Sequence, residues 1–256
     1  MELIVCIKRV PQTAEAEVKI DDSGKDIVKD RLTFDMNEAD SYALEEAILL
    51  KEKFGGAITA VSLGTAEAED TLRIALAKGA DNAIRIKAEE FGELDGYKTA
   101  MIIKEAIKDL KFDAIFTGCM ATDDSYYQVG PVLAETLGVP HATLVSKIEL
   151  TDKKVHVNRE LEGGLIEHLE MSLPAVFAVQ TGINEPRYAS LIAIRRAAAK
   201  EIKVLGKDDI ASEPKLNSTL EELFVPPVGK RAEFLTGTAD EVSARTAEII
   251  KEKGLI

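Results

Sequence analysis

The stretch Phe112–Gly138, FDAIFTGCMATDDSYYQVGPVLAETLG, joins an apolar run to a helical pattern through a loop that carries two adjacent acids, Asp123 and Asp124. A strand that turns into a helix in this way is the repeating unit of an α/β sheet. Two carboxylates at the mouth of such a sheet are compatible with three roles. They can start the helix, lie beside a nucleotide, or take part in metal binding or acid–base chemistry.

The flanking sequence repeats this strand-to-helix rhythm. Apolar runs rich in Val and Ile occur at residues 3–10, 57–64, 82–88 and 112–118, and helical patterns lie between them at 37–56, 65–81 and 96–110. Asn37 and Thr65 are placed to cap the first two helices, and Gly55 is placed to end the first. Strands joined by single helices predict a doubly wound, Rossmann-like parallel α/β sheet of the adenine nucleotide alpha hydrolase-like type, with ligands beyond the carboxyl ends of the strands.

The rhythm changes near Ile148. Residues 146–181 suggest several strands separated by TDKK (151–154) and EGG (162–164), which predicts an antiparallel extension of the sheet. Residues 206–238 have little periodicity before a final helical pattern over 239–254. We therefore predict a nucleotide-binding α/β domain over 1–205 and a C-terminal arm over 206–256 that packs on another subunit.

Composition and the N-terminal sequence disfavour a nucleic-acid partner, secretion and a membrane span. The net charge of −13 and the pI near 4.9 disfavour nucleic acid, because a phosphate backbone requires a basic face. The N-terminus does not resemble a signal peptide, and no apolar stretch approaches the roughly 18 residues of a membrane span. These features predict a protein without a transmembrane segment in the cytoplasm or an equivalent reducing compartment, with Cys6 and Cys119 as buried thiols.

Motifs for bond-making catalysis are missing from the sequence. No second metal ligand stands at metal-site spacing from His141, His156 or His168, and there is no GxSxG, Walker or GxGxxG motif. We therefore predict no catalytic residue and no metal site. In the acidic loop, Ser125 and Gln128 have capping-box spacing, and Gly118 and Ala121 allow a ligand to approach the backbone, so helix capping and nucleotide binding both stay open.

Six segments together resemble the β subunit of electron transfer flavoproteins (the ETF beta/FixA family), in order from residue 1 to about 205. They include residues 4–20, 36–53 and 71–81, the acidic loop with GPVLAETLGVP, and NEPRYASL at 184–191. The most specific is VNRELEGGLIEHLEMSLPAVFAV at 157–179.

The resemblance implies a heterodimer in which an α subunit holds a redox FAD, while this chain binds a structural AMP and forms part of the FAD site. It implies electron carriage from acyl-CoA dehydrogenase-type flavoproteins to a quinone-linked ETF oxidoreductase. Carried over by position, the AMP contacts fall at Cys6, Asn37, Glu38, Ala39, Asp40, Leu63, Gly118, Cys119, Met120, Ala121, Thr122, Asp123, Asp124, Ser125, Tyr126, Tyr127, Gln128 and Val129. The side chains of Glu38, Ala39, Tyr126 and Tyr127 depart from the mitochondrial pattern.

The resemblance also implies two partner-binding sites. Arg159 and Glu160 match residues that approach the α subunit near its flavin, although a cross-strand or interface ion pair that serves only orientation is an alternative. Leu191 matches the leucine that anchors the β subunit on acyl-CoA dehydrogenases, and packing within this chain is its alternative. Two other functions stay open: the β subunit of an electron-bifurcating flavoprotein, with a second FAD in place of AMP and NADH as donor, and a stand-alone homodimeric nucleotide-binding stress-type protein.

Overall fold

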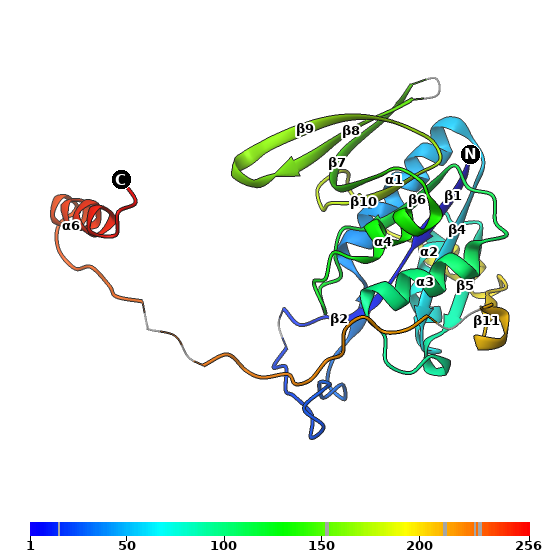
Figure 1. Ribbon diagram of the computed structural model, residues 1–256, viewed down its shortest axis with the longest axis horizontal. Coiled ribbons are helices and arrows are strands. Elements are labelled where there is room, and N and C mark those ends of the chain that lie inside the picture. The colour runs from blue at the N-terminus through cyan, green and yellow to red at the C-terminus, as the bar shows by residue number, and fades with distance from the viewer. Residues whose placement is uncertain (15, 152–153, 212–213, 228, 230–231) are drawn as a thin grey trace.

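The computed structural model describes residues 1–14, 16–151, 154–211, 214–227, 229 and 232–256. The described residues form a nine-stranded sheet with helices on both faces, from which a C-terminal segment extends away (Figure 1). The strand order is β11-β5-β4-β1-β6-β10-β7-β8-β9. The predicted doubly wound α/β fold is confirmed.

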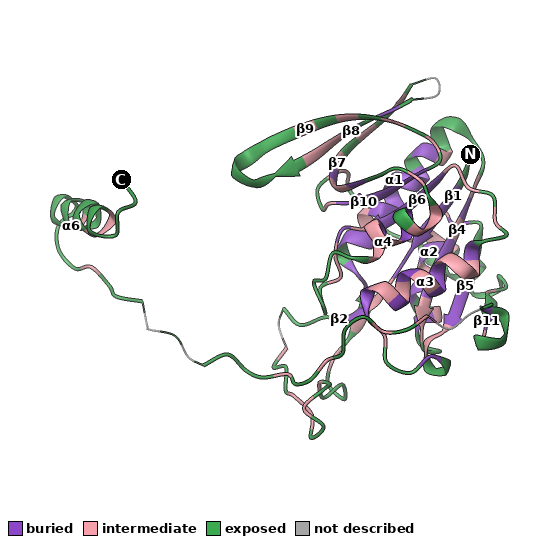
Figure 2. Ribbon diagram, in the orientation of Figure 1, coloured by how far each residue is buried: buried purple, intermediate pink, exposed green. Residues whose placement is uncertain are grey.

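The parallel part of the sheet contains the apolar runs. Its strands are β1 (Glu2–Cys6), β4 (Ala57–Gly64), β5 (Asn82–Lys87), β6 (Ala114–Gly118), β10 (Ala175–Val179), β11 (Lys203–Leu205) and the start of β7 (His141–Thr151). Side chains alternate between two cores, as a strand's period of two requires: Leu3 and Val5 face one, Ile4 and Cys6 the other. Figure 2 shows this buried centre between the helical layers.

Helices α1 (Glu38–Phe54), α2 (Ala68–Lys78) and α5 (Leu191–Ala198) contribute to the first core, and α3 (Gly96–Ile107) and α4 (Val129–Leu137) to the second. Short 3-10 turns lie at η1 (Ala88–Glu90), η2 (Glu162–Gly164) and η3 (Lys207–Asp209). Gly55 ends α1 and Asn37 is its N-cap residue, both as predicted, but the cap predicted at Thr65 was wrong. The side chain of Asn37 makes no cap bond, and α2 begins after Glu67, so Thr65 precedes it.

The antiparallel extension consists of β7, β8 (Lys154–Leu161) and β9 (Leu165–Ser172). Asp152 and Lys153 of the predicted TDKK turn lie outside the described residues. The last strand of the predicted extension, β10, instead returns to the parallel sheet between β6 and β7. All five of its residues are buried, which fits a central strand rather than a half-exposed one.

Two smaller features complete the chain. Strands β2 (Arg9–Pro11) and β3 (Phe34–Met36) pair as a separate antiparallel ribbon. At the other end, α6 (Ala239–Glu252) has no buried residue and lies apart from the sheet (Figure 1). The predicted domain boundary at 205/206 stays a prediction.

Candidate functional site

A pocket of about 180 Å³ opens where the winding of the sheet reverses. Strand β1 pairs with β4 on one side and with β6 on the other, so β1 and β6 flank the switch point. The pocket is lined by the carboxyl ends of these strands, by the first turns of α3 and by the loop that precedes α4. This is the position at which open α/β sheets bind ligands.

Asp40, near the start of α1, holds the two strand ends together. Its Oδ2 accepts the backbone N–H of Lys8 at 2.7 Å, and its Oδ1 accepts the backbone N–H of Gly118 at 2.9 Å. Burial raises the pKa of Asp40 to about 6, although these hydrogen bonds oppose the shift. A methyl group at Gly118 would lie 2.3 Å from Oδ1 of Asp40, so this close approach requires glycine.

The loop from residue 118 to residue 129 is held from the base of α1 as well. Asn37 donates from Nδ2 to the carbonyl of Met120 at 2.9 Å, and its Oδ1 accepts the N–H of Thr122 at 3.1 Å. This explains why Asn37 is not a side-chain cap: both of its polar atoms serve the loop.

The capping box expected at Ser125 and Gln128 was wrong. Ser125 and Tyr127 have φ values of 53° and 56°, in the left-handed region, and α4 begins only at Val129. Because left-handed residues cannot continue into a helix, the segment instead forms a compact loop. Non-glycine residues with this backbone are uncommon and tend to cluster at ligand sites.

The adjacent acids are ion-paired rather than helix-starting. Nζ of Lys8 lies 2.7 Å from Oδ1 of Asp123 and 2.7 Å from Oδ2 of Asp124. Burial acts to lower the pKa of Lys8, but the two carboxylates outweigh it and the net pKa is raised. Sequence reasoning missed Lys8, whose signal was a basic pair, Lys8-Arg9, just after the first buried strand.

The pocket wall combines apolar, thiol and hydroxyl groups. Burial, with a smaller contribution from Asp40, raises the pKa of Cys6 to about 12, and burial raises that of Cys119 to about 11. Both thiols are therefore protonated at neutral pH and are not nucleophiles. Thr117 also lines the pocket, and its buried hydroxyl has no hydrogen-bond partner among the described residues.

Asp95 forms the opposite rim of the pocket. Its Oδ1 caps α3 by accepting the N–H of Lys98 at 2.7 Å, and its Oδ2 accepts the N–H groups of Asn217 and Ser218 at 2.7 and 2.9 Å. Burial opposes ionisation, but these hydrogen bonds outweigh it and lower the pKa of Asp95. The start of the arm is thereby fastened beside the pocket.

The structure gathers most of the predicted cofactor contacts around this pocket. Those that line it are Cys6, Asp40, Leu63, Gly118, Cys119, Met120, Ala121, Asp124, Tyr126, Tyr127, Gln128 and Val129. Those that do not are Asn37, Glu38, Ala39, Thr122, Asp123 and Ser125. Lining residues that the sequence did not suggest are Ile7, Lys8, Leu94, Asp95, Gly96, Thr99, Ile103 and Thr117.

The three predicted partner-binding residues lie away from the pocket lining. Arg159 of β8 pairs across the hairpin with Glu167 of β9 at 3.3 Å and donates to the hydroxyl of Thr143 at 3.0 Å, while Glu160 is exposed. Leu191, the first residue of α5, is 77% exposed, so it does not pack within this chain. Arg159 and Glu160 do not pair with each other in the described structure.

Other chemistry finds little support in the described part of the chain. It contains no group of three or more His, Cys, Asp or Glu side chains arranged to hold a metal ion. Within the same described ranges, no helix is both long and apolar enough to cross a membrane. The pocket lining combines apolar side chains with Lys8 and the carboxylates of Asp40, Asp95 and Asp124.

Comparisons with known proteins agree with this architecture. Residues 26–210 match the model of the electron transfer flavoprotein domain. The electron transfer flavoprotein subunit beta of Bacillus subtilis is 37% identical, with 100% of each chain covered, and that of Bos taurus is 35% identical over 97% of this chain and 98% of its own. Subunit CarD of the caffeyl-CoA reductase-Etf complex of Acetobacterium woodii is 33% identical, again with 100% of each chain covered. The chain belongs to the electron transfer flavoprotein beta-subunit family, and its role is in electron transfer.

Proposed function

We propose that the chain is the beta subunit of a heterodimeric electron transfer flavoprotein and binds AMP in the pocket at the switch point. The observation that carries the proposal is the pocket itself, which combines a left-handed loop, an apolar wall and a buried hydroxyl on Thr117 that has no partner among the described residues. AMP has the matching parts: an aromatic base, ribose hydroxyls and an anionic phosphate.

The residues divide by chemistry around such a ligand. Apolar Leu63, Leu94 and Ile103 suit a base, and the carboxylate of Asp124 suits ribose hydroxyls. The free N–H groups at the start of α4 and the ammonium of Lys8 suit phosphate. No bond-making group is required of this chain.

The antiparallel extension is the proposed contribution to a FAD site shared with the alpha subunit. Leu165 and Ile166, near the tip of the β8–β9 hairpin, are more than half exposed. Ile166 pairs with Glu160 across the hairpin, and Arg159 precedes Glu160 in β8. Exposed apolar residues beside fixed charges are typical of an interface. The FAD would supply the redox chemistry, and this chain would orient and shield it.

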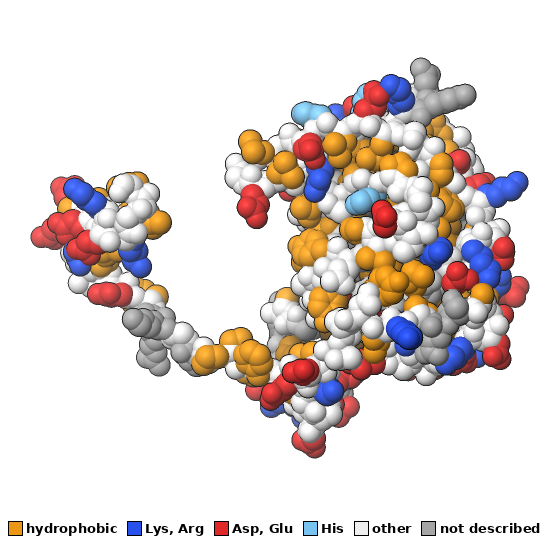
Figure 3. Space-filling view, viewed as in Figure 1, with side chains coloured by type: hydrophobic (Ala, Val, Ile, Leu, Met, Phe, Trp, Pro, Cys, Tyr) orange, Lys and Arg blue, Asp and Glu red, His pale blue; other side chains and the backbone are white. Residues whose placement is uncertain are grey.

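The C-terminal arm is proposed to embrace the same alpha subunit. Figure 3 shows apolar side chains along the arm, where Phe224, Val225 and Phe234 are 71%, 76% and 88% exposed. Such exposure is costly in water and is removed if a partner covers it. The boundary at residue 206 is part of this proposal, as is a cytoplasmic location.

Leu191 is proposed as the anchor for acyl-CoA dehydrogenase-type flavoproteins, from which electrons pass to a quinone-linked oxidoreductase. Tyr188, Leu191 and Ile192 are 99%, 77% and 64% exposed at the start of a short helix. A small group of exposed apolar residues on a helix can insert into a groove and carry much of a binding energy.

Co-purification with the alpha subunit tests the proposal. Heat release and chromatography of the bound nucleotides should give one FAD and one AMP per heterodimer. A colourless homodimer without AMP or FAD would contradict it and would favour a stand-alone nucleotide-binding protein.

A second candidate is the beta subunit of an electron-bifurcating flavoprotein, with FAD in place of AMP and NADH as donor. The chain is 33% identical to a subunit of a caffeyl-CoA reductase-Etf complex and 35% identical to the bovine beta subunit, so sequence identity alone does not separate the two candidates. Two FAD per heterodimer, together with NADH-dependent reduction, would support this candidate over the first.

A further inference from the structure

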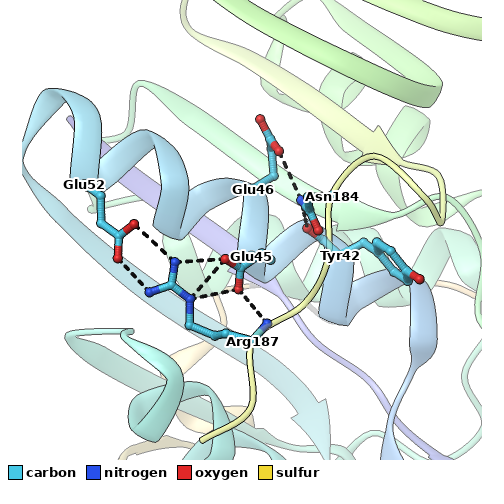
Figure 4. A network of polar contacts seen from close by, with 6 residues as sticks. All are labelled: Tyr42, Glu45, Glu46, Glu52, Asn184 and Arg187. Carbon is cyan, nitrogen blue, oxygen red and sulfur yellow. Dashed lines mark hydrogen bonds and ion pairs between the residues drawn. The ribbon is translucent and has the colours of Figure 1, made fainter.

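The segment between β10 and α5 is fastened to α1 through one arginine. Arg187 sends its guanidinium between two carboxylates of α1 (Figure 4). Nε lies 3.0 Å from both oxygens of Glu45, and Nη2 lies 2.8 Å from Oε1 of Glu45. Nη1 and Nη2 reach Glu52 at 2.6 and 3.2 Å, and the backbone N–H of Arg187 donates to Glu45 at 3.0 Å.

A second contact on the same helix holds the segment three residues earlier. Asn184 donates from Nδ2 to the backbone carbonyl of Tyr42 and to Oε2 of Glu46, each at 3.1 Å (Figure 4). Residues 183–190 contain no helix or strand. Their position is therefore fixed by these side-chain contacts and not by the backbone hydrogen bonds of a helix or sheet.

The far end of α5 is fixed by α2. Ala197 is buried, and Arg73 donates to the carbonyls of Ala197, Ala198 and Lys200 at 3.3, 3.1 and 3.4 Å. The printed contacts thus hold the segment before α5 and the last turn of α5, while Leu191, Ile192 and Ile194 stay exposed. A held anchor loses less conformational entropy on binding than a mobile one.

Stability alone does not explain the charges on α1. The side chain of Glu45 is only 5% exposed, and a buried ion pair is commonly no more stabilising than apolar residues of the same volume. What the charges add is direction, because a guanidinium with two carboxylate partners is fixed in both position and plane.

We infer that Arg187 is a positioning residue for docking: gripped by Glu45 and Glu52, it sets the place and angle at which Leu191 is presented to a partner. The inference rests on the proposed function of Leu191 as the anchor for an acyl-CoA dehydrogenase. It assigns to Arg187 no contact with that partner.

The test uses the complete heterodimer and an acyl-CoA dehydrogenase encoded by the same genome, and it measures KM for the heterodimer and kcat for its reduction. The main variant is the double replacement Arg187→Met with Glu45→Gln, which leaves no unpaired buried charge. The second is Glu52→Gln, on a residue whose side chain is 54% exposed, so that folding is preserved. Lys108→Met, which removes an ion pair from the end of α3 on the other face of the sheet, is the matched control.

We expect the double variant to raise KM by about five- to tenfold, with kcat nearly unchanged. Without the ion pairs, residues 184–190 are mobile before binding, and the entropy lost when they become ordered weakens binding of the partner. Glu52→Gln should raise KM by about twofold, and the control should not change it. In a Leu191→Ala background the effect of the double variant should largely vanish, because positioning matters only if the anchor is present.

The outcomes separate the two hypotheses. If Leu191→Ala leaves KM unchanged, the proposed docking function fails. If Leu191→Ala raises KM but the double variant does not, or if the double variant has the same effect with and without Leu191, docking stands and the positioning role of Arg187 is overturned. Faster amide exchange over residues 184–190 in the double variant, but not in Lys108→Met, would add direct support.

Discussion

Replacing Asp40 should destabilise the protein more at pH 5 than at pH 8. At low pH the protonated or partly protonated side chain still joins the N–H groups of Lys8 and Gly118, and its removal leaves two part-buried donors without this partner. An unsatisfied buried group costs about 1–3 kcal/mol, so Asp40→Ala should cost about 2–6 kcal/mol before titration is considered.

Titration offsets part of that cost. The folded pKa of about 6 lies above the ordinary value of 3.8, so the native state binds the proton more tightly. The associated stability is present below pH 3.8 and is lost as the pH rises through 6. The full loss is about 3 kcal/mol at pH 8 and roughly half of that at pH 5, since one pKa unit corresponds to about 1.4 kcal/mol. The alanine variant has no such loss.

The free energy of unfolding, measured by urea denaturation at both pH values, checks this reasoning. The destabilisation by Asp40→Ala should be about 1–2 kcal/mol smaller at pH 8 than at pH 5. Asp40→Asn is the matched control: it lacks the titration but keeps an acceptor, so it should show the same pH difference with a different offset. An equal or larger destabilisation at pH 8 would refute the buried, raised-pKa carboxyl.

Three further substitutions probe the pocket. Gly118→Ala should destabilise the chain by about 1–3 kcal/mol, because the new methyl group would meet Oδ1 of Asp40 at 2.3 Å, and a thermal melt that matches the wild type would contradict this. Lys8→Met should weaken AMP binding about tenfold in calorimetry, because the loop acids lose their cation and the phosphate loses a positive partner. Thr117→Val should leave the free energy of unfolding nearly unchanged without nucleotide, since the hydroxyl has no partner among the described residues, yet lower AMP affinity; a large loss of stability would show that the hydroxyl is already engaged.

The fold could be predicted from the sequence because continuous apolar runs alternate with helical patterns, and this alternation admits few topologies. The place of β10 could not, since AVFAV follows an antiparallel hairpin in the chain and only its complete burial in the folded protein reveals a central strand. The prediction extended the antiparallel pattern of the preceding strands to AVFAV, although the chain returns there to the parallel sheet.

The acidic loop shows the same limit at the level of side chains. Its spacing favoured a capping box, but Ser125 and Tyr127 adopt left-handed backbone, which local spacing does not encode. Lys8 and Thr117 lie in or beside buried strands and read as ordinary strand residues, so their pocket roles appear only when β1 and β6 lie side by side. The sequence suggested Gly118 as a place where a ligand approaches the backbone, but in the structure the group that approaches it closely is the carboxylate of Asp40.

Helix α1 connects these observations. Three of its acids, Asp40, Glu45 and Glu46, are buried, which a helix packed on a sheet ordinarily avoids. Each contacts a different part of the chain: Asp40 the backbone at Lys8 and Gly118, Glu45 the segment at Arg187, and Glu46 the side chain of Asn184.

The buried acids of α1 therefore position other segments of the chain more than they stabilise the packing of α1 on the sheet. Apolar side chains of similar volume would bury the same face of α1 and keep it on the sheet. They would release the pocket loop at one end of the helix and the docking segment about 8 to 18 Å further along it. One helix thus contacts both the pocket, through Asp40, and the segment that leads to the exposed Leu191, through Glu45.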